Sequence, residues 1–270
     1  MVKEFREYHT NDAGIFVHIK RVLWHGRSNY QDILIIDTET FGKMLILDGA
    51  VMFTERDAFI YHEMLVHPAM CVHEGPRRVL IIGGGDGYAL YEVLKYPVEH
   101  VTLVELDRKV VEVCCKFFDK AGAFEDERVE LVIEDGTKFV ETTGGKVDII
   151  YVDSTDPVGA AKALFSEQFY RNVHEVLGDG ILVAQTESPF YHIEFIQGVK
   201  SKLTAVFQNV HFYTVPIPTY PGGWWSFVFA SDRYTPYEIR REPPADLKYY
   251  THEVHRAAFV LPKWVEEKLK

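Results

Sequence analysis

Cysteine is scarce in this chain of 270 residues: there are three, two of them the adjacent Cys114 and Cys115, with no C-x-x-C pair. Such a set builds no disulfide framework. Long apolar runs are also missing, since none approaches the ~18–20 residues that span a bilayer. The acidic start, residues 1–7, lacks the apolar core of a secretory signal. These absences predict a cytoplasmic protein that does not act at a membrane.

Basic side chains are in the minority, with 29 Lys and Arg against 40 Asp and Glu, a formal net charge of −11. Nucleic-acid binding depends largely on neutralising phosphates with basic groups, so we expect no nucleic-acid partner. An acidic surface suits cations better. Metal-ligand spacing is missing too, because Val66 stands where the H-E-x-x-H pattern beginning at His62 needs its second histidine. We therefore expect no metal.

The first part of the chain has the patterning of β-strands. Alternating, branched side chains predict strands at 15–22, 32–37 and 43–47. Asp48-Gly49 follows the third and favours the tight turn of a hairpin. Residues 1–65 are therefore predicted to form a small N-terminal β-strand domain. It has too little mass for a robust core and must pack on the rest of the chain or on another subunit.

Residues 66–270 alternate apolar runs with amphipathic segments. Runs that are apolar on both faces are typical of a parallel sheet covered by helices; they occupy 79–82, 101–104, 129–133, 147–152 and 181–184. Helical spacing recurs between them, at 90–94, 109–118 and 167–177. This alternation predicts an α/β fold with an open, doubly wound sheet. Ligands of such sheets bind beyond the carboxyl ends of the strands.

Polar residues follow each of the five predicted strands. After the first comes Gly83-Gly-Gly-Asp-Gly, a loop that lets a ligand approach backbone N–H groups, although Tyr88 replaces the third glycine of the G-x-G-x-x-G pattern. The later strand ends present Glu105, Asp135-Gly136, Asp153 with Asp156, and Gln185. Each alone could be a helix cap or a solvated acid. Together, acids at four successive strand ends and an amide at the fifth, with no basic residue at these positions, indicate a site for a nucleoside and a cation.

Six further segments carry a family resemblance: Leu47-Asp-Gly-Ala-Val, Thr54-Glu-Arg-Asp-Ala-Phe-Ile-Tyr-His-Glu-Met, the glycine loop, Asp153-Ser-Thr-Asp-Pro-Val-Gly, Ile217-Pro-Thr-Tyr-Pro and Lys248-Tyr-Tyr-Thr-His-Glu-Val-His-Arg-Ala-Ala-Phe-Val-Leu-Pro. In these the chain resembles the spermidine synthases, the polyamine aminopropyltransferases, over nearly its whole length. The glycine loop alone is shared with many methyltransferases, but the combination is highly specific.

The resemblance implies a methyltransferase-type, Rossmann-like catalytic domain behind the small β domain, in homodimers or homotetramers. It also implies that decarboxylated S-adenosylmethionine, a co-substrate rather than a cofactor, gives its aminopropyl group to putrescine or a related amine and leaves as 5′-methylthioadenosine. Donor-binding residues implied by the motifs are Gln31, His62, Gly83, Gly85, Asp86, Glu105, Asp135, Gly136 and Ala160. Acceptor-binding residues implied in the same way are Tyr61, Asp153, Ser154, Thr155, Asp156, Gln185 and Tyr220.

The chemistry of these residue types agrees with that assignment. An aliphatic amine with a pKa near ~10 arrives protonated, so a carboxylate must take a proton before the nitrogen can attack. Asp153 is the expected base, with Tyr61 as its hydrogen-bonding partner. The sulfonium is already a good leaving group, so no metal is required. Asp86 would repel the carboxylate of intact S-adenosylmethionine.

Three features depart from the family pattern: Tyr88 stands in place of a glycine, Leu90-Tyr91-Glu-Val-Leu-Lys-Tyr96 replaces the commoner L-R-E-V-L-K-H, and Ala160 stands in place of a proline. Tyr88 either narrows the donor pocket or packs against neighbouring apolar side chains. Alternative functions remain: an S-adenosylmethionine-dependent methyltransferase, an aminopropyltransferase that prefers cadaverine, agmatine or spermidine, or a non-catalytic paralogue that binds nucleosides or polyamines.

Overall fold

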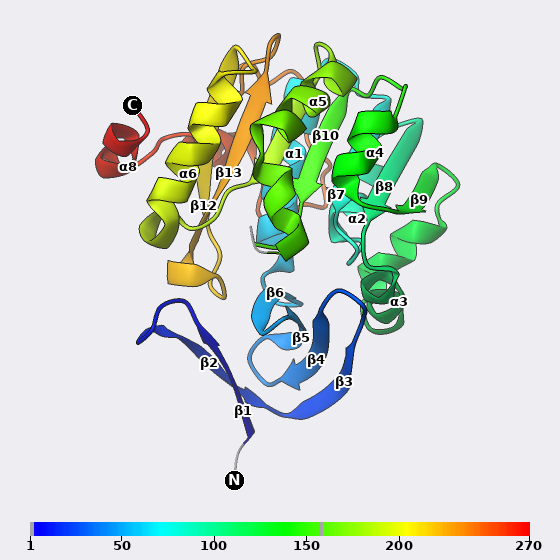
Figure 1. The fold of residues 1–270 in the computed structure, drawn as a ribbon, viewed down its shortest axis with the longest axis vertical. Coiled ribbons are helices and arrows are strands. Elements are labelled where there is room, and N and C mark those ends of the chain that lie inside the picture. Colours follow the sequence, from blue (N-terminus) through cyan, green and yellow to red (C-terminus); the bar gives the residue numbers. More distant parts are fainter. Residues whose placement is uncertain (1–2, 157–158) are drawn as a thin grey trace.

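The computed structural model describes residues 3–156 and 159–270, and it begins with two small antiparallel sheets (Figure 1). A hairpin of β1 (Lys3–Tyr8) and β2 (Gly14–Ile19) forms the first sheet. The second is a meander of β3 (Arg21–Arg27), β4 (Asp32–Thr38), β5 (Gly42–Leu47) and β6 (Ala50–Thr54). Asp48 and Gly49 join β5 to β6 with φ of 48° and 86°, which is the backbone of the predicted hairpin turn.

A seven-stranded sheet forms the centre of the rest of the chain, in the order β12-β13-β11-β10-β7-β8-β9. Five strands are parallel and coincide closely with the predicted apolar runs: β7 (Arg78–Gly83), β8 (His100–Glu105), β9 (Val129–Ile133), β10 (Ile149–Asp153) and β11 (Ile181–Gln185). The antiparallel β12 (Asn209–Pro216) and β13 (Trp224–Ser231) complete it. The expected Rossmann-like, doubly wound α/β fold with a small N-terminal β domain is confirmed.

Helices cover both faces of this sheet because alternate strand residues point to opposite faces. One apolar cluster joins Ile81 and Tyr151 to α1 (Ala58–Val72) and α2 (Tyr88–Leu94), and α7 (His252–Ala258) joins it too. A second joins Ile82 and Val152 to α4 (Gly136–Thr142), α5 (Glu167–Leu177), α6 (Pro189–Thr204) and α8 (Lys263–Lys268). α3 (Arg108–Phe117) packs instead on β4 and β5. Among the described helices, none has the length and apolarity needed to cross a membrane.

The structure refines two expectations for the N-terminal region. The expected boundary after residue 65 lies inside α1, and the chain passes from one sheet system to the other between Thr54 and Ala58. The predicted strand at 15–22 is two strands that break at Lys20. α1 escaped prediction because it is buried on almost every side, so its apolar residues show no helical period, and it contains Pro68.

Candidate active site

The candidate site lies where the strand order of the large sheet reverses. β7 and β10 are neighbours, with Gly83 opposite Asp153, while β8 and β9 continue on one side and β11 on the other. At such a point the connections from neighbouring strands run to opposite sides, which leaves a crevice beyond the carboxyl ends of the strands. A cavity of about 420 Å³ occupies this crevice and is closed below by Gln31, Leu45, Leu47 and Met52 of the N-terminal sheets.

The glycine loop brings the backbone close to the neighbouring strand ends. Gly83 has φ of 84°, and a Cβ there would lie 2.1 Å from the Asp153 carbonyl oxygen. A Cβ on Gly85 would lie 2.8 Å from Glu105 Oε2. The Gly84 N–H donates to the Asp153 carbonyl at 2.9 Å, which locks the loop onto β10. Larger side chains would displace both strand-end acids.

Asp153 is held from one side only. Its Oδ1 accepts a hydrogen bond from the Tyr61 hydroxyl at 2.8 Å, whereas Oδ2 is buried with no hydrogen-bond partner among the described residues. Burial, and then the nearby charge of Asp86, raise the pKa of Asp153 to about 6, against the opposing effects of His62 and the Tyr61 hydroxyl. A buried carboxylate oxygen without a partner is prepared for a donor supplied by a ligand.

His62 and Asp86 lie beside Asp153. The His62 Nδ1–H donates to the Ala58 carbonyl at 2.7 Å, and Nε2 lies 3.7 Å from Asp86 Oδ1. One ligand atom from each of His62, Asp86 and Asp153 lies within 4.8 Å of the other two, so this trio can surround a cation. Spacing along the chain could not reveal the trio, because its members come from a helix, a loop and a strand.

The residues implied for the donor line the same cavity. The two oxygens of Glu105 accept from the N–H groups of Gly85 (3.2 Å) and Asp107 (2.8 Å), and burial raises the Glu105 pKa to about 7. The Gln31 amide donates to Asp107 at 3.0 Å. Asp135 caps α4 by accepting from Thr137 N–H at 2.9 Å. Gly136 also lines the cavity, while the side chain of Ala160, in η2 (Gly159–Phe165), lies outside the described part of the structure.

All the residues implied for the acceptor except Asp153, which lines the larger cavity, line a smaller adjoining cavity of about 30 Å³: Tyr61, Ser154, Thr155, Asp156, Gln185 and Tyr220. The Gln185 amide donates to the Ser154 carbonyl at 3.3 Å and so supports the loop after β10. Tyr220 donates to the Met52 carbonyl of β6, which brings its ring over the cavity. Burial, and then Glu187, raise the pKa of Asp156 to about 7.

Two acids at or next to this smaller cavity were not predicted. Glu7 of β1 lines it; its Oε2 accepts from Val51 N–H at 2.9 Å, and burial raises its pKa to about 7, with Asp156 adding to the effect. Glu187 is buried behind Asp156, with Oε2 3.1 Å from His192 Nδ1. Glu187 follows a strand end by two residues, so the strand-end rule could have found it. Nothing in the sequence marks Glu7.

Tyr88 packs away from the cavity. Its ring centroid lies 4.8 Å from that of Phe53, 5.2 Å from His62 and 6.5 Å from Phe118. It is not among the residues that line the 420 Å³ cavity. Of the two interpretations of this position, the structure therefore supports packing rather than narrowing of the donor pocket.

Charge of one sign dominates the main cavity. Six of its lining residues are acids: Asp48, Asp86, Glu105, Asp107, Asp135 and Asp153. Within residues 3–156 and 159–270, no lysine or arginine lines it. Such a cavity favours a ligand with positive charge and hydroxyl groups and disfavours phosphates.

Comparison with known proteins places the chain in a family. Residues 58–239 match the model of the spermine/spermidine synthase domain, and residues 5–55 match that of the spermidine synthase tetramerisation domain. The chain belongs to the spermine/spermidine synthase family. The suspected resemblance is thus confirmed.

Members of this family are similar to the chain along almost its whole length. A polyamine aminopropyltransferase of Methanocaldococcus jannaschii is 46% identical, covering 98% of this chain and 94% of the relative. One from Shouchella clausii is 44% identical, covering 98% of each. Among solved structures, a spermidine synthase in complex with the transition-state analogue AdoDATO has a TM-score of 0.96 at 40% identity, covering 99% of this chain and 94% of that one. The spermidine synthase of Thermotoga maritima has a TM-score of 0.94 at 39% identity, with the same coverage.

Proposed function

We propose that this enzyme transfers the aminopropyl group of decarboxylated S-adenosylmethionine to an amine, with putrescine as the expected acceptor. The observation that carries the proposal is the unpartnered Oδ2 of Asp153, which lines the larger of two acid-lined cavities and whose partner Tyr61 lines both. The larger cavity suits the nucleoside and the cationic tail of the donor. The smaller one, which shares Tyr61, Ser154 and Tyr220 with it, suits the amine acceptor.

The reaction needs a free amine at neutral pH. Asp153 takes a proton from the acceptor ammonium, whose pKa near ~10 otherwise keeps it protonated. The nitrogen lone pair then attacks the aminopropyl CH₂ next to sulfur. As the C–N bond forms, the C–S bond breaks and its electron pair stays on sulfur, which gives 5′-methylthioadenosine. The secondary ammonium product keeps its remaining protons, because its pKa is also near ~10, and Asp153 releases the proton that it took to solvent. Holding both cations in line supplies much of the remaining rate.

The acid-lined site also favours this reaction over methyl transfer from S-adenosylmethionine. Asp86, beside His62, would meet the donor's aminopropyl ammonium favourably and would repel the carboxylate that intact S-adenosylmethionine carries there. The reaction needs no metal, because the sulfonium is already a good leaving group, and we assign the space beside Asp86 and Asp153 to the ammonium groups of the two substrates.

The small cavity favours an acceptor with two positive ends. Glu7 and Asp156 line it and Glu187 lies next to Asp156, so a diamine with one nitrogen on Asp153 would place the other near these acids. We infer that the enzyme works in the cytoplasm as a homo-oligomer, in line with the match of residues 5–55 to a tetramerisation domain.

One assay tests the proposal. Purified enzyme is incubated with decarboxylated S-adenosylmethionine and putrescine, cadaverine, agmatine or spermidine, and methylthioadenosine is measured. Release that depends on an amine, with putrescine used best and with chelator present throughout, supports the proposal. Methylated products formed from intact S-adenosylmethionine would establish the methyltransferase instead, and binding without turnover of any donor would indicate a non-catalytic paralogue.

A further inference from the structure

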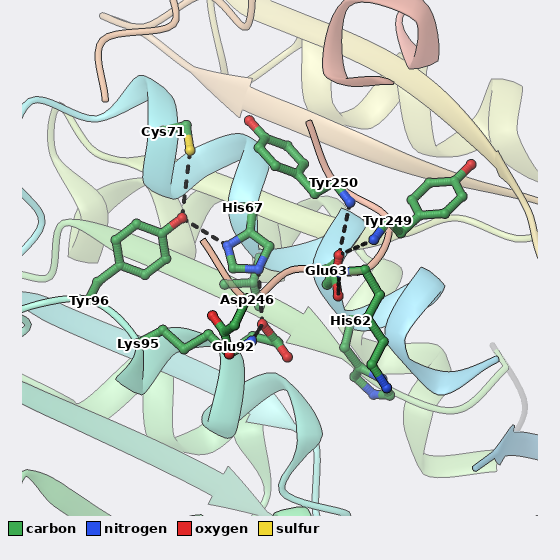
Figure 2. A network of polar contacts seen from close by, with 12 residues as sticks. His62, Glu63, His67, Cys71, Glu92, Lys95, Tyr96, Asp246, Tyr249 and Tyr250 are labelled. Atoms are coloured by element: carbon green, nitrogen blue, oxygen red, sulfur yellow. Dashed lines mark hydrogen bonds and ion pairs between the residues drawn. The ribbon is translucent and has the colours of Figure 1, made fainter. Parts of the chain in front are cut away.

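A buried polar network behind α1 takes no part in the reaction just described (Figure 2). Its first member is Glu63, only 2% exposed. The Glu63 carboxylate accepts three backbone N–H groups, from Lys248 at 2.9 Å, Tyr249 at 2.7 Å and Tyr250 at 2.8 Å. These donors belong to residues 246–250, which we call the strap. Burying a carboxylate is costly, and three charge-assisted hydrogen bonds offset that cost only while the strap stays in place.

The strap is attached to α2 as well. Asp246, at its start, lies 3.4 Å from Lys95 Nζ, which is also 2.9 Å from Glu92 Oε2. Glu92 bonds His67 Nε2 at 2.9 Å, and His67 Nδ1 bonds the Tyr96 hydroxyl at 2.8 Å. Since His67 is on α1, one turn beyond Glu63, the network joins the strap, α1 and α2 into one unit (Figure 2).

This unit lies directly behind the reacting groups. Glu63 follows His62 and stands two residues after Tyr61, the side chain that bonds Asp153. In Figure 2 the His62 ring points away from the strap, whereas Glu63 reaches it. α2 begins just after the glycine loop that carries Asp86. Any rotation of α1 or shift of α2 would therefore move groups on both sides of the reacting atoms.

We propose that Glu63 is a positioning residue: by binding the strap it fixes the rotation of α1, and so holds the Tyr61 hydroxyl on Asp153 and the His62 ring beside Asp86. The inference rests on the proposed aminopropyl transfer. It assigns a function to a segment of the chain that forms no part of the cavity. The strap also lies outside residues 58–239, the part that matches the synthase-domain model.

Glu63→Gln is the informative variant, because it keeps the shape but turns an NH₂ group toward backbone N–H donors. In the folded variant we expect kcat to fall about tenfold, since small misplacements of reacting groups are costly. Binding of methylthioadenosine, measured by calorimetry, should stay within about twofold of wild type, because Glu105 and Asp135, which we assign to the nucleoside, lie at the ends of β8 and α4 and not on α1. Glu63→Asp, which retains the charge on a shorter side chain, should show the same pattern more weakly and serves if Glu63→Gln does not fold.

A double-mutant cycle separates positioning from stability. If Glu63 acts through Tyr61, Glu63→Gln should reduce kcat far less in a Tyr61→Phe background than in wild type. Val173→Ala is the matched control, because it removes buried volume from α5 on the other face of the sheet. It should lower the melting temperature and leave kcat unchanged.

Wild-type kcat in folded Glu63→Gln, or strictly additive effects with Tyr61→Phe, would overturn the positioning role while leaving aminopropyl transfer intact. A wild-type enzyme that releases no methylthioadenosine would instead overturn the proposed function, and this inference with it.

Discussion

At the scale of single residues, Asp153 combines two properties that a general base needs. Tyr61 fixes its Oδ1, while Oδ2 lies next to Gly84 of the glycine loop and has no partner among the described residues. Its pKa of about 6 leaves it largely ionised at neutral pH yet closer to the operating pH than an exposed carboxyl group. Burial of Oδ2 without a partner is unfavourable for folding. The same burial raises the pKa of Asp153 and so makes it a better proton acceptor.

The first prediction follows from this arrangement. Asp153→Asn keeps the size of the side chain and removes its ability to accept the ammonium proton. We expect turnover to fall at least ~10²-fold, the usual scale for a positioned base, with methylthioadenosine binding nearly unchanged. Steady-state kinetics and calorimetry on the same preparation measure the two quantities. Turnover at the wild-type level would exclude Asp153 as the base.

Tyr88 is the second residue whose role can be isolated. Because its ring packs on Phe53, His62 and Phe118, Tyr88→Gly should remove aromatic contacts and place glycine at the start of α2. We expect a loss of about 2 kcal/mol in unfolding free energy, of which ~1 kcal/mol is the helix cost of glycine. Preference among amines should barely change. Melting curves and amine-panel kinetics decide the point; a large change of specificity at an unaltered melting temperature would contradict the packing role.

At the scale of elements, the strands and their ends were the predictable part. Apolar runs located β7 to β11, and the rule that ligands bind beyond carboxyl ends brought Glu105, Asp135 and Asp153 to one edge. Strand periodicity carries no information on how distant segments meet. Glu7 reaches the acceptor cavity because the hairpin folds back over β6, and the sequence could not have shown that.

The buried acids of the two cavities predict how the stability of the fold depends on pH. Burial raises the pKa values of Glu7, Asp156 and Glu105 to about 7 and that of Asp153 to about 6. Unfolded carboxyl groups titrate near ~4, so the folded chain binds more protons between about pH 4 and 7. The contribution of these four acids to the unfolding free energy therefore becomes less favourable as pH rises through that window.

A bound dication opposes this loss of stability at higher pH, because it binds the ionised acids while remaining protonated itself. We expect putrescine to raise the melting temperature more at pH 8 than at pH 5.5, and the acceptor KM to fall over the same range. Glu7→Gln, which removes one of the acids, should weaken both dependences. Thermal melts with and without putrescine at the two pH values provide the measurement. An equal shift at both would mean that these acids do not bind the amine.

At the scale of the whole molecule, the N-terminal hairpin connects the acceptor cavity to an exposed surface. On one face, Phe5 and Val17 pack on the four-stranded sheet, and Glu7 reaches the cavity. On the other face, Tyr8 and Phe16 are 67% and 63% exposed. Residues 5–55, which include the hairpin, match a tetramerisation domain, and two large aromatic side chains on one face of the hairpin are left uncovered by the rest of the chain. The outer face of the hairpin is thus the surface where a second copy of the chain is expected to pack.

The last prediction tests that connection. Phe16→Glu places a charge on the outer face of the hairpin and should lower the native mass measured by light scattering. Since β1 also carries Glu7, a loosened hairpin should raise the acceptor KM several-fold while methylthioadenosine binding stays unchanged, because the donor residues lie on other elements. Val260→Glu, at a position 75% exposed near the C-terminus, is the matched control and should alter neither quantity. If Phe16→Glu keeps the wild-type mass, the outer face of the hairpin is not an assembly surface. If the mass falls and the acceptor KM stays the same, the hairpin holds Glu7 in place without help from a second copy.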